Sequence, residues 1–282
     1  MNSQRYCRKV CKKSGSNFVY SFYLLPKKRR LALEAFYAFC RLVDDVVDSD
    51  QPPAKAAQAL TQWRQEVENI YAGKPNHPVG LALAPVVKSF KVPKKYFLEI
   101  ISGCETDLTQ KQFDTFVETD QYCYRVAACV GLVCLHLFEV DLTEATVQAG
   151  IALGKALQWT NIVRDIASDL SLGRIYLPQE DLNRFGVALA DLQSPTENSL
   201  ALLDLIYFQI KRARAYYAQA WESFPSDKKQ KKRLIAAFLM GKIYERLLDK
   251  VARNPLQVFA GKVSVSGEEK LAIAFKIWFS LL

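Results

Sequence analysis

Two clusters of acidic residues have types and spacings that could do chemistry. The first is the sequence DDVVD at residues 44–48, and the second lies within NIVRDIASD at residues 161–169. Each cluster holds two aspartates four residues apart, and on a helix such a pair shares one face: Asp44 with Asp48, and Asp165 with Asp169. Asn161 adds a carboxamide one turn before Asp165 on the same face.

Both clusters are embedded in apolar sequence, so their charges need a partner. Like charges at this spacing cost a helix roughly 0.2–0.5 kcal/mol per pair, and partial burial raises that cost. Mg²⁺ is a natural partner because it binds a few carboxylates together with phosphate oxygens. Arg41 and Arg164 lie beside the clusters and could bind phosphate through paired hydrogen bonds. The alternative interpretation is that both clusters are ordinary acidic helix faces exposed to solvent. The occurrence of two such clusters in one chain favours instead a site for a Mg²⁺–diphosphate unit.

The elements that carry these clusters are predicted to be long helices. Apolar residues recur at three- and four-residue steps from Leu31 to Val47, which is the helical period. Similar patterns between local breakers predict helices over about residues 26–49, 54–72, 94–112, 114–138, 142–170, 196–223 and 228–253, with a short helix from Pro178 to Gly186 and a loop from there to Pro195. We find no strand alternation or repeat, and therefore predict one all-α domain over residues 1–282.

Composition narrows the class of protein. The 282 residues carry 38 Lys and Arg against 29 Asp and Glu, a net charge of +9. No stretch approaches the ~18–20 apolar residues of a membrane span, and the N-terminus lacks the apolar core of a signal peptide, so a cytoplasmic protein is expected. The most apolar runs, Ala127–Phe138 and Leu271–Leu282, are predicted to be buried helices, and the second could also touch a membrane surface.

Several other chemistries lose support from the residue counts. Seven cysteines without paired spacing argue against a disulfide framework, and two histidines argue against zinc or histidine-based catalysis. The basic groups at residues 27–30 and 228–233 come without a nucleic-acid motif, so no nucleic-acid partner is expected. The positive charge suits an anionic small substrate or an anionic membrane surface.

Two longer motifs resemble the squalene/phytoene synthase family of head-to-head prenyl transferases. Residues 122–131, YCYRVAACVG, are similar to the family segment YCxxVAGxVG. Residues 154–178 match the family pattern GxxxQxxNIxRDxxxDxxxGRxYxP at every specified position. The N-terminal sequence SFYLLPKKRR, followed by YAFCRLVDDVVD, also fits, so the resemblance covers most of the chain.

The resemblance implies a fold and a set of site residues. Long helices would surround a central apolar cavity, with the two aspartate motifs facing each other across it. Mg²⁺ and diphosphate would be held by Asp44, Asp48, Asn161, Asp165 and Asp169. Catalytic roles are implied for the four aspartates and Tyr122, and diphosphate binding for Ser14, Asn17, Tyr37, Arg41, Gln158, Arg164, Arg174 and Tyr244. Asn17 departs from the serine common in the family, and Lys262 replaces a usual arginine.

The family members join two identical prenyl diphosphates through a cyclopropyl intermediate. The pattern YCYRVA with VGLVC looks most like bacterial presqualene diphosphate synthase of hopanoid biosynthesis, which implies two farnesyl diphosphates as substrates. Phytoene synthase, with two geranylgeranyl diphosphates, is the nearest alternative, and a non-catalytic helical assembly or lipid-binding factor is a third. NADPH is a less favoured cofactor than Mg²⁺, because the longer, anchored squalene synthases are the ones that use it. Peripheral membrane contact is expected, and oligomeric state and substrate chain length stay open.

Overall fold

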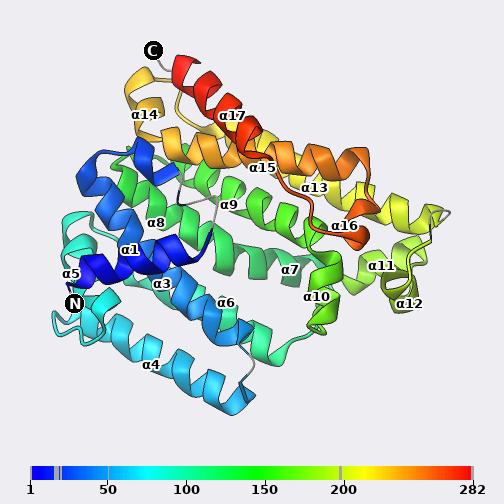
Figure 1. Ribbon diagram of the computed structural model, residues 1–282, viewed down its shortest axis with the longest axis horizontal. Coiled ribbons are helices and arrows are strands. Elements are labelled where there is room, and N and C mark those ends of the chain that lie inside the picture. Colours follow the sequence, from blue (N-terminus) through cyan, green and yellow to red (C-terminus); the bar gives the residue numbers. More distant parts are fainter. Residues whose placement is uncertain (1, 16–18, 20, 50, 197–198, 281–282) are drawn as a thin grey trace.

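The computed structural model describes residues 2–15, 19, 21–49, 51–196 and 199–280. Within them the chain is a single bundle of helices (Figure 1). The first half comprises α1 (Ser3–Lys13), η1 (Phe22–Leu24), α3 (Lys27–Asp48), α4 (Pro53–Tyr71), α5 (Pro78–Ser89), α6 (Lys94–Thr109), α7 (Phe116–Cys123), η2 (Tyr124–Ala128) and α8 (Cys129–Phe138). The second half comprises α9 (Glu144–Arg164), α10 (Ile166–Ser171), α11 (Gln179–Phe185), α12 (Leu189–Gln193), α13 (Leu200–Ser223), α14 (Lys228–Arg233), α15 (Ile235–Arg253), α16 (Gln257–Ala260) and α17 (Gly267–Ser280).

Helix α9 runs through the middle of the bundle (Figure 1) and ends within the second acidic cluster, so that Asp165 directly follows it and Asp169 lies on α10. Its neighbours include α8, α13, α15 and η2. The side of α9 that faces them is built from small residues, because Ala149, Ala152 and Ala156 are almost completely buried. Small side chains let the neighbouring helices approach closely. The predicted all-α architecture is therefore confirmed, and the described residues form no strand, only an isolated bridge between Gln112 and Ile175.

Helix α3 carries the first acidic cluster and follows its predicted bounds. Pro26 precedes the first helical residue with φ −53° and so starts the helix without needing an N–H donor. The apolar side chains predicted from the three- and four-residue spacing are buried, among them Leu33, Phe36 and Val43. The helix ends at Asp48, so Asp44 and Asp48 occupy its last turn.

Three predicted helices contain an irregularity that the periodic pattern did not show. The segment predicted as one helix over 114–138 contains a π-helical stretch, Tyr124–Ala128, between α7 and α8. Gly154 of α9 lies against this stretch so closely that an added Cβ would be 2.6 Å from the Cα of Ala128. The helix predicted over 142–170 bends at Asp165, which has φ −101° and ψ 14°. The helix predicted over 228–253 is interrupted at Leu234.

Other predictions are confirmed or need correction. The short helix after Pro178 is α11, and Gly186 ends it with φ 66°, a conformation that suits glycine. The loop expected after Gly186 contains the short helix α12. The run Ala127–Phe138 is buried as expected. The C-terminal run was expected to be buried, but α17 exposes most of its large apolar side chains, because only one of its faces packs on α15.

The cysteines and the apolar helices agree with an ordinary protein core. All seven cysteines are free thiols, six of them buried and Cys40 half-buried. By length and composition the helical run Phe116–Phe138 could cross a membrane, but 56% of its most apolar window is buried inside the protein. Such burial is typical of a core helix in the centre of a domain.

Candidate active site

A polar cavity of about 1450 Å³ lies between the ends of α3 and α9. It brings together both acidic clusters, which are more than a hundred residues apart in sequence. Its walls include most of the predicted site residues: Tyr37, Arg41, Asp44, Asp48, Tyr122, Gln158, Asn161, Asp165, Asp169, Arg174 and Tyr244. Helix α8 contacts both α3 and α9, and this shared neighbour helps to place the two clusters across one cavity.

The carboxylates in this cavity are destabilised by their own charge and by poor solvation. The pKa of Asp44 is raised to about 7, first by desolvation in the cleft and then by the neighbouring Asp48. Its side chain still has 51% exposure, because it faces the open cavity. The pKa of Asp169 is likewise raised to about 7 by desolvation and by Asp165. Both carboxylates would be stabilised in their charged form by a cation.

Three arginines partly offset this negative charge. The Nη2 atom of Arg41 lies 2.5 Å from an oxygen of Asp45, in the same turn as Asp44. Arg164 forms a bidentate ion pair with Asp165, with Nε donating over 2.7 Å, and does not itself line the polar cavity as described. Arg174 lies in the segment after α10, and its guanidinium bonds to Asp48 at the end of α3, 126 residues away in sequence.

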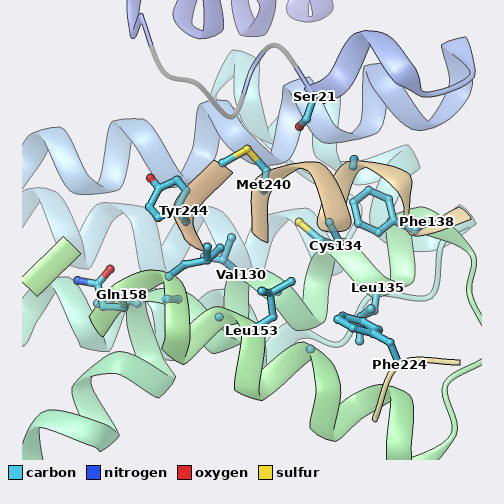
Figure 2. Close-up of a pocket in the computed structure, with 18 of the residues that line it drawn as sticks. Ser21, Val130, Cys134, Leu135, Phe138, Leu153, Gln158, Phe224, Met240 and Tyr244 are labelled. Atoms are coloured by element: carbon cyan, nitrogen blue, oxygen red, sulfur yellow. The ribbon is translucent and has the colours of Figure 1, made fainter. Parts of the chain in front are cut away.

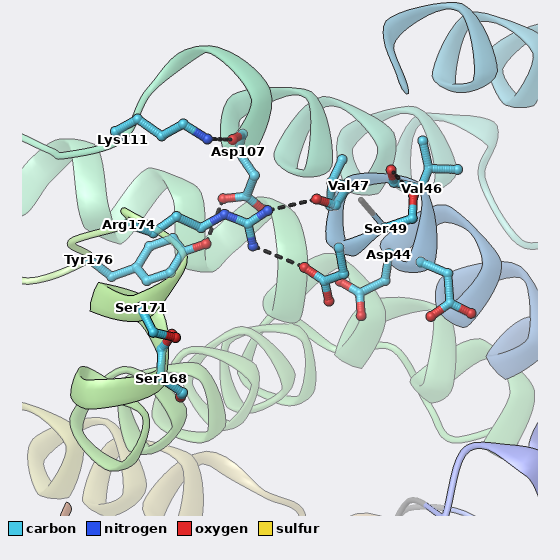
Figure 3. A network of polar contacts seen from close by, with 12 residues as sticks. Asp44, Val46, Val47, Ser49, Asp107, Lys111, Ser168, Ser171, Arg174 and Tyr176 are labelled. Carbon is cyan, nitrogen blue, oxygen red and sulfur yellow. Dashed lines mark hydrogen bonds and ion pairs between the residues drawn. The ribbon is translucent and has the colours of Figure 1, made fainter. Parts of the chain in front are cut away.

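Arg174 joins the two acidic motifs directly (Figure 3). Its Nη1 donates to Asp48 over 2.9 Å, and its Nη2 donates to the carbonyl of Val47 over 2.8 Å. Its backbone N–H donates to the carbonyl of Asp169 over 2.9 Å. One residue thus holds the second motif, through its backbone, against the last turn of α3, through its guanidinium. The Nε atom of Arg174 is buried and has no hydrogen-bond partner among the described residues.

A fifth acidic residue, Asp107 of α6, faces the same cavity and was missed by the sequence analysis. It accepts hydrogen bonds from Tyr122 over 3.1 Å and from Tyr176 over 2.7 Å. The two phenol rings stack with their centroids 5.0 Å apart. Burial raises the pKa of Asp107 to about 6 and also raises the pKa of both tyrosines. A sequence signal existed, because Asp107 continues the apolar face of α6 at the spacing Phe97, Ile100 and Cys104.

A second, apolar cavity of about 850 Å³ adjoins the polar one. Five residues border both cavities: Val126, Val130, Gln158, Asn161 and Tyr244. In Figure 2, Gln158 and Tyr244 stand at one end of the apolar cavity, and Leu135, Phe138 and Phe224 stand at the other. The central apolar cavity implied by the family resemblance is therefore present. The π-helical stretch supplies part of its wall through Val126 and Ala127.

Of the two N-terminal residues proposed for diphosphate binding, only Ser14 is described by the structure. Ser14 lies just after α1, where its hydroxyl donates to the carbonyl of Cys11 over 2.7 Å, and it is not among the described lining residues of either cavity. Asn17 lies outside the described residues. Lys262 is exposed in the segment between α16 and α17. Its family role stays a prediction.

The donor set fits a hard divalent cation that is shared with a phosphate ligand. The Oδ1 atom of Asn161 is buried and has no hydrogen-bond partner in the described part of the chain, although it faces the cavity. Among those same residues, no three Asp, Glu, His or Cys side chains group closely enough to hold a metal ion by themselves. Mg²⁺ is typically bound by one or two carboxylates together with substrate phosphates, so this sparse set is compatible with it.

Comparison with known proteins identifies the family. The squalene/phytoene synthase family model matches residues 11–269. Phytoene synthase from Arthrospira platensis is 32% identical over 282 residues, covering 96% of this chain and 90% of the relative. Phytoene synthase from Mycobacterium tuberculosis is 34% identical over 272 residues, covering 96% of this chain and 88% of the relative.

Solved structures share the fold over almost the whole chain. A dehydrosqualene synthase in complex with ligand superposes with a TM-score of 0.85 at 31% identity, covering 99% of this chain and 96% of that one. Squalene synthase HpnC from Alicyclobacillus acidocaldarius superposes with a TM-score of 0.81 at 27% identity, covering 91% and 94%. Together with the two-motif cavity, these matches show that the chain belongs to the squalene/phytoene synthase family of prenyltransferases.

Proposed function

We propose that the protein condenses two farnesyl diphosphates head to head, with Mg²⁺, into presqualene diphosphate. The observation that carries this proposal is the shared wall of the two cavities, formed in part by Gln158, Asn161 and Tyr244. A compartment lined by carboxylates and arginines adjoins an apolar compartment. A prenyl diphosphate has the same division, with a polyanionic head on a hydrocarbon tail.

The acidic residues would hold the metal and the arginines would hold the diphosphate. Mg²⁺, when bound, supplies neutralisation of the diphosphate and assists its departure from the allylic carbon. Its proposed ligands are Asp44, Asp48, Asn161, Asp165 and Asp169. Arg41 and Arg174 line the cavity and could donate to phosphate oxygens, while Arg164 orients Asp165 from behind through their ion pair.

The apolar cavity would protect the cation that ionisation leaves behind. One substrate loses diphosphate, and its C1 cation is attacked by the double bond of the second substrate, so that a carbon–carbon bond forms. Loss of one proton closes the cyclopropane ring, which gives presqualene diphosphate, free diphosphate and H⁺. Water would quench the cation, and the walls that exclude it are apolar, among them Val130, Leu153 and Met240.

Tyr122 is the proposed proton handler, acting together with Asp107. The raised pKa of Tyr122 keeps its phenol protonated, so the phenol alone is a poor base. Its hydroxyl donates to Asp107 over 3.1 Å, and Asp107 is mostly ionised above pH 6 because its pKa is about 6. The phenol oxygen could therefore accept the substrate proton while it passes its own proton to Asp107. The departing diphosphate is the alternative base.

The choice between two substrates rests on different observations. The YCYRVA and VGLVC sequences favour farnesyl diphosphate, and two solved structures similar to this chain are named for squalene and dehydrosqualene. The sequence relatives named phytoene synthase favour geranylgeranyl diphosphate, which makes the condensation of that substrate the second candidate. NADPH stays the less favoured cofactor, since the proposed reaction ends at the cyclopropyl diphosphate.

A product assay tests the proposal. Purified protein is incubated with Mg²⁺ and each prenyl diphosphate in turn, with and without NADPH, and the products are identified by mass spectrometry. We expect presqualene diphosphate from farnesyl diphosphate. A C40 product from geranylgeranyl diphosphate alone would establish the second candidate, and formation of squalene only with NADPH would show that the reaction continues.

The variant Asp165→Asn separates an enzyme from a non-catalytic relative. It keeps the size of the side chain but removes the charge proposed to hold the metal, so turnover should fall by a factor of about 100 or more. Asp204→Asn, at an exposed position on α13, is the matched control and should leave turnover unchanged. Equal turnover in both variants would contradict the proposed metal site.

A further inference from the structure

Helix α17 presents an unusual row of apolar side chains to solvent. Leu271, Phe275, Trp278 and Phe279 are all exposed, Phe275 by 63% and Trp278 by 48%. Their spacing puts them on one face of the helix. The rings contact one another, with the centroids of Phe275 and Phe279 4.6 Å apart. The other face packs on the core through Ile273, Ala274 and Ile277. We call the four exposed residues the aromatic row.

Two basic groups that are distant in sequence meet at Glu139, just after α8. The carboxylate of Glu139 is 3.4 Å from Nζ of Lys28 and 2.9 Å from Nε of Arg29. Its backbone carbonyl accepts a hydrogen bond from Arg233. The groups at residues 27–30 and 228–233 therefore lie at the same end of the molecule, and we call them the basic collar: Lys27, Lys28, Arg29, Arg30, Lys228, Lys229, Lys231, Lys232 and Arg233.

The basic collar lies next to the far end of the apolar cavity. Phe138, which lines that end, directly precedes Glu139, and Phe224, also at that end, lies four residues before Lys228 (Figure 2). Ser21 lines the cavity as well, and the neighbouring Tyr23 and Leu24 are exposed. The apolar cavity thus adjoins the carboxylate-lined cavity at one end and lies near cationic and apolar surface residues at the other.

The aromatic row belongs to the same end of the molecule. Helix α15 starts directly after α14, supplies Ala236, Ala237 and Met240 to the cavity wall, and is the helix on which α17 packs. In Figure 1 the C-terminal end of α17 points to the end of the molecule that carries α14. The aromatic row, the basic collar and the apolar end of the cavity are therefore gathered in one region.

We propose that this region docks onto an anionic lipid bilayer, with the aromatic row inserted at the interface and the basic collar against the headgroups. Exposed Trp, Phe and Leu on one helix face, combined with lysines and arginines, are the pattern of interfacial membrane binding. The net charge of +9 means that the protein as a whole is attracted to an anionic membrane surface. Binding in this orientation turns the apolar end of the cavity towards the bilayer, so the hydrocarbon part of the product lies on the side that faces lipid.

The positive charge of the basic collar favours lipid, and not a second copy of the chain, as the partner that covers this region. Two copies joined through their aromatic rows would bring their basic collars towards each other, and like charges across an interface oppose association. An anionic bilayer offers both the apolar phase and the opposite charge. The proposal does not depend on which prenyl diphosphate is the substrate.

Vesicle flotation with the full chain tests the proposal. Vesicles of phosphatidylcholine alone are compared with vesicles in which about a third of the lipid is phosphatidylglycerol. We expect binding to the anionic vesicles only, and its loss at about 0.5 M salt, where screening is strong. Equal binding to both kinds of vesicle, or binding to neither, would overturn the proposal.

Matched pairs of variants assign the binding to the two features. Two double variants are tested: one changes the aromatic row by Phe275→Ser and Trp278→Ser, and the other changes the basic collar by Lys229→Glu and Lys232→Glu. Each double variant should lower the vesicle partition coefficient roughly tenfold or more. The controls are Val117→Ser with Leu189→Ser, which are exposed on α7 and α12, and Lys55→Glu with Lys74→Glu. The controls should bind normally, and an equal loss in them would contradict the proposal.

Two further measurements distinguish membrane binding from damage to the active site and from self-association. Synthase activity on detergent-dispersed substrate should be the same in all these variants, because none of the changed residues lines either cavity. Sedimentation equilibrium reports self-association. If the aromatic variant changed the mass of the protein in solution while leaving vesicle binding intact, the row would be a protein–protein interface and the membrane proposal would fail.

Discussion

Arg174 and Asp48 are 126 residues apart in sequence, yet the guanidinium of Arg174 donates to the Asp48 carboxylate over 2.9 Å. A second donor of the same guanidinium reaches the carbonyl of Val47. Because the backbone of Arg174 is also bonded to Asp169, this arginine sets the distance between the two acidic motifs. The separation of the motifs decides whether both can reach one diphosphate, so the link is a structural requirement for the proposed activity.

The first prediction concerns the two-pronged contact of Arg174. Arg174→Lys keeps the charge but cannot reproduce the contact in which two separate nitrogens each reach one acceptor, since lysine lacks the planar fork. The loss of one charged hydrogen bond should lower kcat/KM by a factor of about 10–100. Steady-state kinetics would measure it, with the exposed Arg253→Lys as control. Unchanged kcat/KM in the Arg174 variant would show that the link does not position the motifs.

The second prediction uses the pH dependence of stability at Asp107. Its pKa is about 6 in the folded protein and 3.8 when unperturbed, so the folded state favours the protonated form. The protonated carboxyl of Asp107 therefore contributes its full stability to the folded protein below pH 3.8, and this contribution is lost as the pH rises to about 6. Asp107→Asn, which cannot ionise, should be more stable than the parent by about 2 kcal/mol at pH 7–8.

Chemical denaturation at several pH values would measure this difference for Asp107→Asn. The advantage should shrink as the pH falls from 6 to 4, because the parent carboxyl then becomes protonated. Asp204→Asn, on the surface of α13, should show no such trend. An advantage that is independent of pH would contradict the assignment. The same variant should lose activity, since an amide cannot accept a proton from Tyr122.

A third prediction concerns the close packing of Gly154 on the π-helical stretch. An added Cβ would lie 2.7 Å from the carbonyl oxygen of Ala127 and 2.6 Å from the Cα of Ala128, and backbone atoms cannot move aside as a side chain can. Gly154→Ala should destabilise the protein by about 1–3 kcal/mol and reduce activity, since Ala127 lines the apolar cavity. Gly267→Ala, where no atom lies within 4 Å, is the control in thermal unfolding. Equal melting temperatures in the two variants would contradict the contact.

A fourth prediction addresses the length of the substrate. Phe138 stands at the far end of the apolar cavity, so Phe138→Leu should enlarge the space available to the tail (Figure 2). The ratio of kcat/KM for geranylgeranyl over farnesyl diphosphate should rise by about tenfold, the effect of one or two methylene-sized contacts. Phe39→Leu, equally buried but away from both cavities, controls for the loss of stability. A ratio that stays constant would mean that another residue ends the cavity.

The sequence predicted the helices well where local patterns decide them. The spacing of Leu33, Phe36 and Val43 and the start after Pro26 placed α3 within a residue or two of its observed bounds. The helix predicted over 114–138 is confirmed over residues 116–138, but the pattern did not predict its π-helical stretch Tyr124–Ala128 or the bend at Asp165. Helix α9 packs closely against the π-helical stretch, and a periodic pattern contains no information about such a neighbour.

The sequence predicted most residues of the site, and the family resemblance implied that the two aspartate motifs face each other across a cavity. The sequence alone determined which helix faces carry Asp44, Asp48, Asp165 and Asp169, because residues four apart on a helix lie together. Only the tertiary structure decided that Arg174 bonds to Asp48. The same holds for the hydrogen bonds that Asp107 accepts from Tyr122 and Tyr176. It also holds for the contacts of Lys28 and Arg233 with Glu139. Helical periodicity is a local property of a few neighbouring residues, whereas these contacts depend on how helices distant in sequence pack against one another.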